Sequence, residues 1–178
     1  EATDLARDGA LTFGPVLARY ADWAVERFKA AGVRTVLALM REGEVLGSLL
    51  ARAAEHAGLQ LNVVPCFASR LATARAAMTE VTPTRAAELL EGSAYLTPQA
   101  VLDILGLGDE AARFLDAEAR KKPLGSSESV AGLLTLLFQL PRIRELLENR
   151  RAQSHALAFE YLSSLVGDDP VVGVIDLG

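Results

Sequence analysis

The sequence has few residues suited to redox or metal chemistry: one cysteine, Cys66, and two histidines, His56 and His155. One cysteine cannot form an internal disulfide, and the histidines lie far apart in the chain. No zinc-type cluster and no cysteine–histidine catalytic pair is therefore indicated. Cys66 lies in an apolar segment and is predicted to be a small buried side chain. Without disulfides or a recognisable signal peptide, the sequence favours a reducing, cytoplasmic setting.

Positive charge and long hydrophobic runs are also scarce. The formal net charge is -5, so the chain has no overall positive field for a polyanion, and nucleic-acid binding is not expected. The longest apolar stretch, residues 131–140, is interrupted by polar residues and is too short to cross a bilayer, so no membrane span is predicted. A hydrophobic fraction of 51% is typical of a globular domain. We expect one folded domain fragment of a larger protein, 1–178.

The strands are predicted from three apolar, β-branched runs, at residues 33–40, 61–67 and 171–177. A helical pattern over residues 43–57 joins the first two runs into a βαβ unit, whose strands are expected to be parallel. An earlier helix is predicted from Pro15 to about Ala31, because proline is tolerated in a first helical turn. The predicted fold class is α/β, a Rossmann-like parallel sheet with a large all-helical insertion, incomplete at the C-terminus.

The insertion is predicted over residues 82–166, where only helical patterns occur, as a lobe beside the sheet with an exposed hydrophobic patch. Thr82 and Thr97 each precede a first-turn proline, which predicts two capped helices. The remaining signals predict helix stops at Gly92 and Gly106, a helix over 109–120, a cap at Ser126 or Ser127, a break at Pro141, and a stop at Gly167.

Candidate ligand-binding residues follow the first two predicted strands. Arg41, Glu42 and Gly43 lie where the first strand turns into a helix, a place where backbone amides receive a phosphate or carboxylate. Ser69 and Arg70 follow the second strand, so we expect Arg41 and Arg70 to converge on one anion. The alternative is structural, with a solvated Arg41 and with Ser69 as a helix cap.

The third predicted strand ends at Asp176, and Gly178 begins the loop that follows. A carboxylate at a strand end is suited to a metal or to a ribose hydroxyl. Asp176 is equally suited to a turn or a helix cap, so both interpretations remain open.

Several short segments together resemble a known bacterial family: residues 13–17 with Trp23, residues 36–43, Ser69-Arg70, and residues 174–178. The family is described as a predicted haloacid-dehalogenase-type hydrolase, found in large proteins that also carry glycosyltransferase domains. Its usual strand-end motif is closer to Ala-Arg-Asp-Gly, whereas this chain has Met40-Arg41-Glu42-Gly43. The Asp-x-Asp motif of dehalogenase-type nucleophiles has no match here. The strand-end pattern is also similar to that of type I phosphoribosyltransferases, whose acidic strand end and loop hold a ribose phosphate.

The leading interpretation is a phosphosugar- or nucleotide-binding Rossmann-like domain of a bacterial glycosyltransferase-associated protein. Its expected partners are an anionic small molecule, such as a phosphosugar or sugar nucleotide, and the neighbouring domains of the parent protein. Two alternatives remain open, a non-catalytic structural or docking module and a haloacid-dehalogenase-type phosphohydrolase. The sequence indicates no particular cofactor, metal or catalytic residue.

Overall fold

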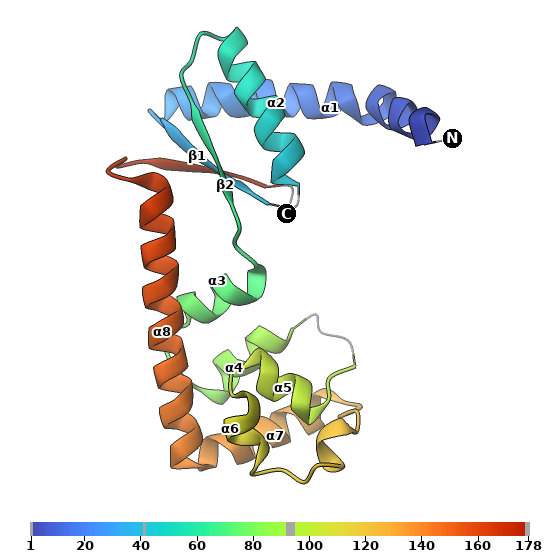
Figure 1. The fold of residues 1–178 in the computed structure, drawn as a ribbon, viewed down its shortest axis with the longest axis vertical. Coiled ribbons are helices and arrows are strands. Elements are labelled where there is room, and N and C mark those ends of the chain that lie inside the picture. The colour runs from blue at the N-terminus through green and yellow to red at the C-terminus, as the bar shows by residue number, and fades with distance from the viewer. Residues whose placement is uncertain (1, 41, 92–94, 177–178) are drawn as a thin grey trace. The chain divides into compact units, whose positions relative to one another are not determined.

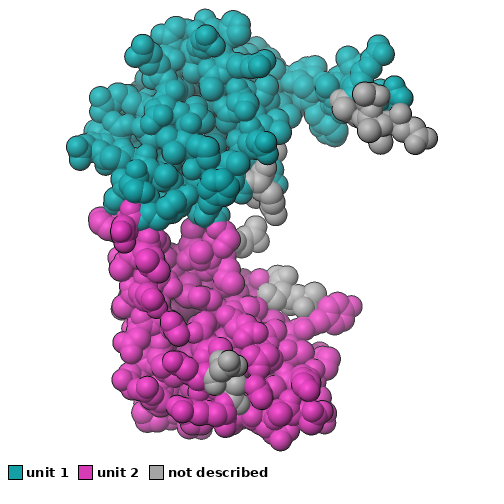
Figure 2. Space-filling view, in the orientation of Figure 1, with its two compact units in different colours: residues 1–68, 161–178 teal, residues 69–160 magenta. Residues whose placement is uncertain are grey.

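The computed structural model describes residues 2–40, 42–91 and 95–176. They form two compact units, coloured separately in Figure 2. The sheet unit comprises residues 1–68 and 161–178, and the helical unit comprises residues 69–160. The protein is thus mixed α/β, with a small parallel sheet and a majority of helices.

The sheet unit contains three short strands, and Figure 1 shows them beside two helices. Its elements are α1 (Ala2–Ala30), β1 (Thr35–Leu39), α2 (Gly43–His56), β2 (Asn62–Cys66) and β3 (Val172–Ile175). The strand order is β2-β1-β3, and both neighbours pair with β1 in parallel. Leu37 is opposite Val64 on one side and Val174 on the other. The three predicted strands and their parallel pairing are confirmed.

Helices α1 and α2 pack against each other and cover one face of this sheet. Val36 and Ala38 of β1 join a buried cluster with Leu46 and Leu50 of α2 and with Ala24 of α1. Alternate residues of a strand point to the same face of the sheet, so Val36 and Ala38 both face the helices. Their burial against α1 and α2 accounts for the apolar side chains at these positions of β1. Leu46 and Leu50 recur at helical spacing, which confirms the predicted helix after β1.

Helix α1 begins earlier than predicted. The helix runs from Ala2, and Pro15 lies inside it rather than in its first turn. The residues before Pro15 include good helix formers, and they continue the helix although proline has no amide for the hydrogen bond to Leu11. Pro15 is exposed, so its ring disturbs no buried packing.

The helical unit has a core of its own. Its elements are α3 (Arg70–Ala77), α4 (Pro83–Leu90), α5 (Pro98–Ile104), α6 (Gly108–Ala112), the 3-10 turn η1 (Ala119–Lys121), α7 (Ser127–Gln139) and most of α8 (Pro141–Val166). Buried leucines from α5, α7 and α8 meet in one cluster, among them Leu102, Leu134 and Leu147. Residues 82–91 and 95–166 contain no strand, as predicted.

Most of the predicted helix boundaries in this unit are confirmed. Thr82, Thr97 and Ser126 each cap a helix through the side-chain oxygen, and Pro141 separates α7 from α8. Gly106 has the positive φ expected after a helix end, and so does Gly167, which follows α8 in the sheet unit. Gly92 lies outside the described residues.

The predicted helix over residues 109–120 is wrong. Helix α6 ends at Ala112, and the chain then turns before η1. The carboxylate of Asp116 accepts hydrogen bonds from the amides of Glu118 and Ala119, at 3.0 and 3.1 Å. A short acidic side chain that binds nearby amides in this way competes with helix formation. Helical periodicity therefore overestimated the length of this element.

Candidate functional site

The first candidate site lies where β1 ends and α2 begins, and two glycines hold the helix close to the sheet. A Cβ on Gly43 would lie 2.8 Å from the carbonyl carbon of Ala38. A Cβ on Gly47 would lie 3.1 Å from the Cβ of Ala38. Gly43 therefore needs to be glycine for steric reasons, Gly47 is tightly packed against the side chain of Ala38, and α2 starts in direct contact with the backbone of β1.

Glu42 precedes α2 and makes no side-chain cap hydrogen bond to the first turn. Its main-chain carbonyl accepts the amides of Val45 and Leu46, at 3.2 and 3.0 Å. The earlier amides of a helix have no carbonyl partner within the helix, and the helix dipole is positive at this end. The start of α2 thus offers donors for an anionic group.

The end of β3 reaches the same edge of the sheet. Ile175 is opposite Ala38 in the parallel register, so Asp176 follows β3 at the edge where β1 ends. Asp176 is exposed, and its main-chain carbonyl accepts a hydrogen bond from Tyr20 of α1 at 3.2 Å. This bond ties the strand end to α1, and the carboxylate lies on an exposed residue.

The end of β2 carries an interaction that the sequence did not reveal. The hydroxyl of Tyr161 accepts the amide hydrogen of Phe67 at 2.8 Å. Cys66 is fully buried, and burial raises the pKa of its thiol, while a hydrogen bond with Tyr161 opposes that rise. Tyr161 is 94 residues from Phe67 in the chain, and its own surroundings in the sequence carry no motif.

The predicted site residues separate into two groups. Glu42, Gly43 and Asp176 all lie at the carboxyl edge of the sheet. Ser69 caps α3 by accepting the amide of Ala72 at 3.1 Å, as its alternative role predicted, and it belongs to the helical unit.

The positions of the other three predicted site side chains are not described. Arg41 and Gly178 lie outside the described residues, and so does the side chain of Arg70, the first residue of α3. Their convergence on one anion stays a prediction.

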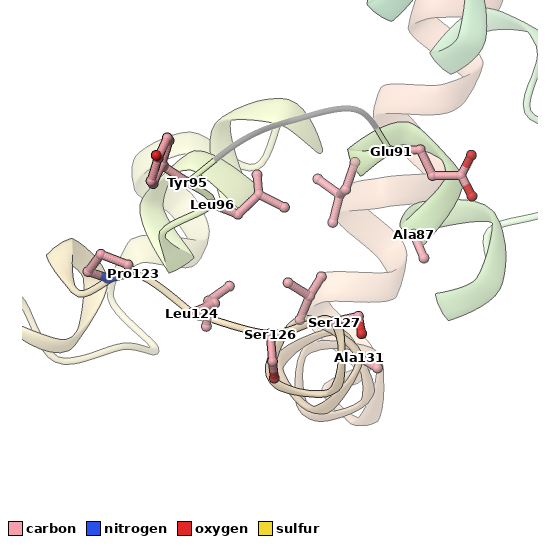
Figure 3. Close-up of a pocket in the computed structure, with 12 residues that line it drawn as sticks. Ala87, Glu91, Tyr95, Leu96, Pro123, Leu124, Ser126, Ser127 and Ala131 are labelled. Atoms are coloured by element: carbon pink, nitrogen blue, oxygen red, sulfur yellow. The ribbon is translucent and has the colours of Figure 1, made fainter.

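The helical unit also contains an apolar cavity that no pattern in the sequence indicated. It has a volume of about 800 Å³ and lies between α4, the segment before α5 and the start of α7 (Figure 3). Leu96 points toward the open space, and Tyr95 at its rim is 91% exposed with a φ of 59°. Leu90, Leu124 and Val130 also contribute to the apolar lining. These residues come from distant segments, so no local pattern indicates the cavity.

The described residues contain no group of His, Cys, Asp and Glu side chains arranged to hold a metal ion. Among the described helices, none is both long enough and apolar enough to span a membrane. The fold and the sheet-edge site define a mixed α/β protein with a small parallel sheet and a separate helical unit. Comparison with protein-family models and with curated proteins gives no match for this chain.

Proposed function

We propose that the sheet unit is a Rossmann-like domain that binds a phosphosugar or a sugar nucleotide at the carboxyl edge of its sheet. The observation that carries this proposal is the position of α2. It begins next to β1, the central strand, with Gly43 against the backbone of Ala38. In open parallel sheets, ligands bind beyond the carboxyl ends of the strands where the strand order reverses.

The order β2-β1-β3 reverses at β1, so the start of α2 lies at that point of the sheet. Helix N-termini bind phosphate through their free amides and dipole, and Gly43 lets this N-terminus lie directly against the end of β1. Asp176 at the end of β3 is suited to accept hydrogen bonds from ribose or sugar hydroxyls. An anionic ligand is therefore held at one end and a hydroxylated ring at the other.

Arg41 comes between β1 and α2 in the sequence, and Arg70 follows β2. We assign Arg41 to the phosphate, because a guanidinium group binds phosphate through paired hydrogen bonds, and its convergence with Arg70 stays a prediction. The resemblance of residues 13–17, 36–43 and 174–178 to the glycosyltransferase-associated bacterial family supports a sugar-linked ligand and a cytoplasmic setting. The parent would then be a multidomain protein that builds glycans.

The test is calorimetric titration of the chain with UDP-glucose and glucose 1-phosphate. We expect Arg41→Ala to weaken binding by about 1–3 kcal/mol, the loss of a charge-assisted hydrogen bond. Arg52→Ala is the matched control, because Arg52 is exposed further along α2. Equal affinities for both variants, or no binding by the wild type, would contradict the proposal.

A second candidate function is a docking module, and an exposed aromatic group on α1 supports it. Trp23 is 51% exposed, stacks on Tyr20 with ring centroids 5.8 Å apart, and has the guanidinium of Arg27 5.7 Å from its ring centroid. Trp, Tyr and Arg are the residues most enriched at the centres of protein interfaces. A neighbouring domain of the parent protein is the expected partner.

Hydrogen exchange separates this second candidate from the first. If a neighbouring domain covers α1, the amides around Trp23 exchange more slowly in the parent protein than in the chain alone. Equal exchange in both would contradict the docking function. That outcome does not affect the ligand proposal, which the calorimetric titration tests separately.

A further inference from the structure

Three arginines line a small cavity in the helical unit. Arg75 comes from α3, and Arg150 and Arg151 come from α8. The cavity measures about 10 Å³, room for one water-sized atom, and the rest of its lining is largely apolar, including Leu105, Phe138 and Leu147. The chain as a whole carries a net charge of -5, so this local concentration of positive charge is opposite to the overall sign.

Arg75 is held in place by the backbone of another helix. Its Nη2 donates a hydrogen bond to the carbonyl of Ile104 at the end of α5. Gly106 has a φ of +73°, and a Cβ there would lie 3.0 Å from Nη1 of Arg75. The turn after α5 thus fits against the guanidinium plane, and glycine leaves the room for it.

The Nε of Arg75 is buried and has no hydrogen-bond partner among the described residues. A charged donor without a partner is costly in an apolar surrounding, because it has lost its water contacts. Burial lowers the pKa of Arg75, and the nearby charge of Arg150 lowers it further. Arg75 and Arg150 line the same cavity, so their like charges oppose each other there.

The carboxylates around the cavity do not balance these charges. Arg151 pairs with Glu148 at 3.0 Å, and Arg150 contacts the neutral side-chain oxygen of Gln153 at 3.2 Å. No described acidic residue forms an ion pair with Arg75 or Arg150, and none lines the cavity. Three guanidinium groups and one carboxylate leave a surplus of about two positive charges.

We propose that Arg75, Arg150 and Arg151 form a binding site for a phosphate group, with one of its oxygens inside the cavity. A phosphate monoester carries a charge of about -1.5 to -2 at neutral pH, which matches the surplus. Its oxygens also accept hydrogen bonds in the geometry that guanidinium groups offer. The site lies in the helical unit and uses none of the residues assigned to the sheet-edge ligand.

The test measures thermal unfolding of the chain with increasing inorganic phosphate, against sodium chloride at matched ionic strength. A specific site raises the unfolding temperature until the site is saturated. We expect Arg150→Gln to weaken the apparent phosphate affinity by about tenfold or more, the effect of one charge-assisted hydrogen bond. Arg142→Gln is the matched control, since it removes the same charge from an exposed pair with Glu145 on α8.

A second titration, with glycerol 3-phosphate, identifies the source of the phosphate. Tighter binding of the monoester assigns the site to a phosphorylated ligand, and tighter binding of inorganic phosphate assigns it to the free ion. The proposal is overturned if the rise in unfolding temperature saturates with neither inorganic phosphate nor glycerol 3-phosphate. It is also overturned if Arg142→Gln and Arg150→Gln weaken phosphate binding equally. The Arg41→Ala variant is expected to keep this phosphate response, so failure here and failure at the sheet edge are distinguishable.

Discussion

Gly43 is the residue on which the start of α2 depends. A side chain at this position meets the backbone of Ala38, which cannot rotate away as a flexible side chain does. We expect Gly43→Ala to lower the free energy of unfolding by about 1–3 kcal/mol, the usual cost of overpacking. Urea denaturation followed by circular dichroism measures the change.

Gly132 provides the control for that substitution. It lies in α7 with open space around it, so a methyl group meets no neighbour there. Alanine is the better helix former, and Gly132→Ala is expected to stabilise the chain by about 0.5–1 kcal/mol. If both variants change stability in the same direction, the close packing at Gly43 does not control the position of α2.

Cys66 makes the stability of the sheet unit depend on pH. Burial raises the pKa of its thiol, despite the opposing hydrogen bond with Tyr161, so the folded chain keeps the proton to higher pH than the unfolded chain. The stability contributed by the neutral thiol is complete below the unfolded-state pKa of about 8.5. It is lost as pH rises through the higher folded-state pKa.

We therefore expect the stability difference between the wild type and Cys66→Ala to shrink between about pH 8 and pH 10. Denaturation series at several pH values measure this difference directly. Both proteins share every other titrating group, so the subtraction isolates the thiol. A difference that stays constant over this range would show that Cys66 ionises equally in both states.

The sequence could indicate some of these residues but not others. Gly43 was found because it follows an apolar strand and precedes a helical pattern, which are both local signals. The contact between Tyr161 and Phe67 joins residues 94 positions apart, and no periodicity reports it. The cluster of Arg75, Arg150 and Arg151 is hidden for the same reason, since each arginine alone resembles a solvated charge.

Elements with strong local signals were predicted well. The caps at Thr82, Thr97 and Ser126 depend on a hydroxyl reaching an amide three residues ahead, and such a contact is readable from sequence. The predicted helix over residues 109–120 failed because the Asp116 carboxylate captured two amides. Hydrophobic periodicity does not show which backbone amides will donate hydrogen bonds to a side chain.

Helix α1 offers a direct test at the same scale. Proline inside a helix costs about 3 kcal/mol relative to alanine, and Pro15 is exposed within α1. We expect Pro15→Ala to increase the helical circular dichroism signal and to slow hydrogen exchange in the preceding turn. Arg19→Ala, exposed in the same helix, is the control and should change neither. Unchanged exchange in Pro15→Ala would mean that the turn before Pro15 is not limited by proline.

The whole molecule combines two hydrophobic cores that share no residue. The sheet unit buries Val36, Leu50 and Ile175, and the helical unit buries Leu102 and Ile143. The parallel pairing of β1 and β2 followed from their short crossover. That β3 joins the same parallel sheet was also predicted, because all three runs have the pattern of buried strands. Its place beside β1 was not predicted, since a long helical segment separates β3 from the other two strands.

The two cores lead to a prediction for the isolated parts. Residues 69–160 form one continuous segment with its own buried cluster, and domains of this size commonly fold alone. We expect this fragment to show helical circular dichroism and cooperative unfolding in urea. The fragment 1–68 lacks β3, so one edge of β1 is unpaired and the place of Ile175 in the core is unfilled. It should therefore be much less stable. If residues 69–160 were unfolded alone while the full chain folds cooperatively, the helical unit would depend on the sheet unit, and the chain would be one domain with a dependent lobe.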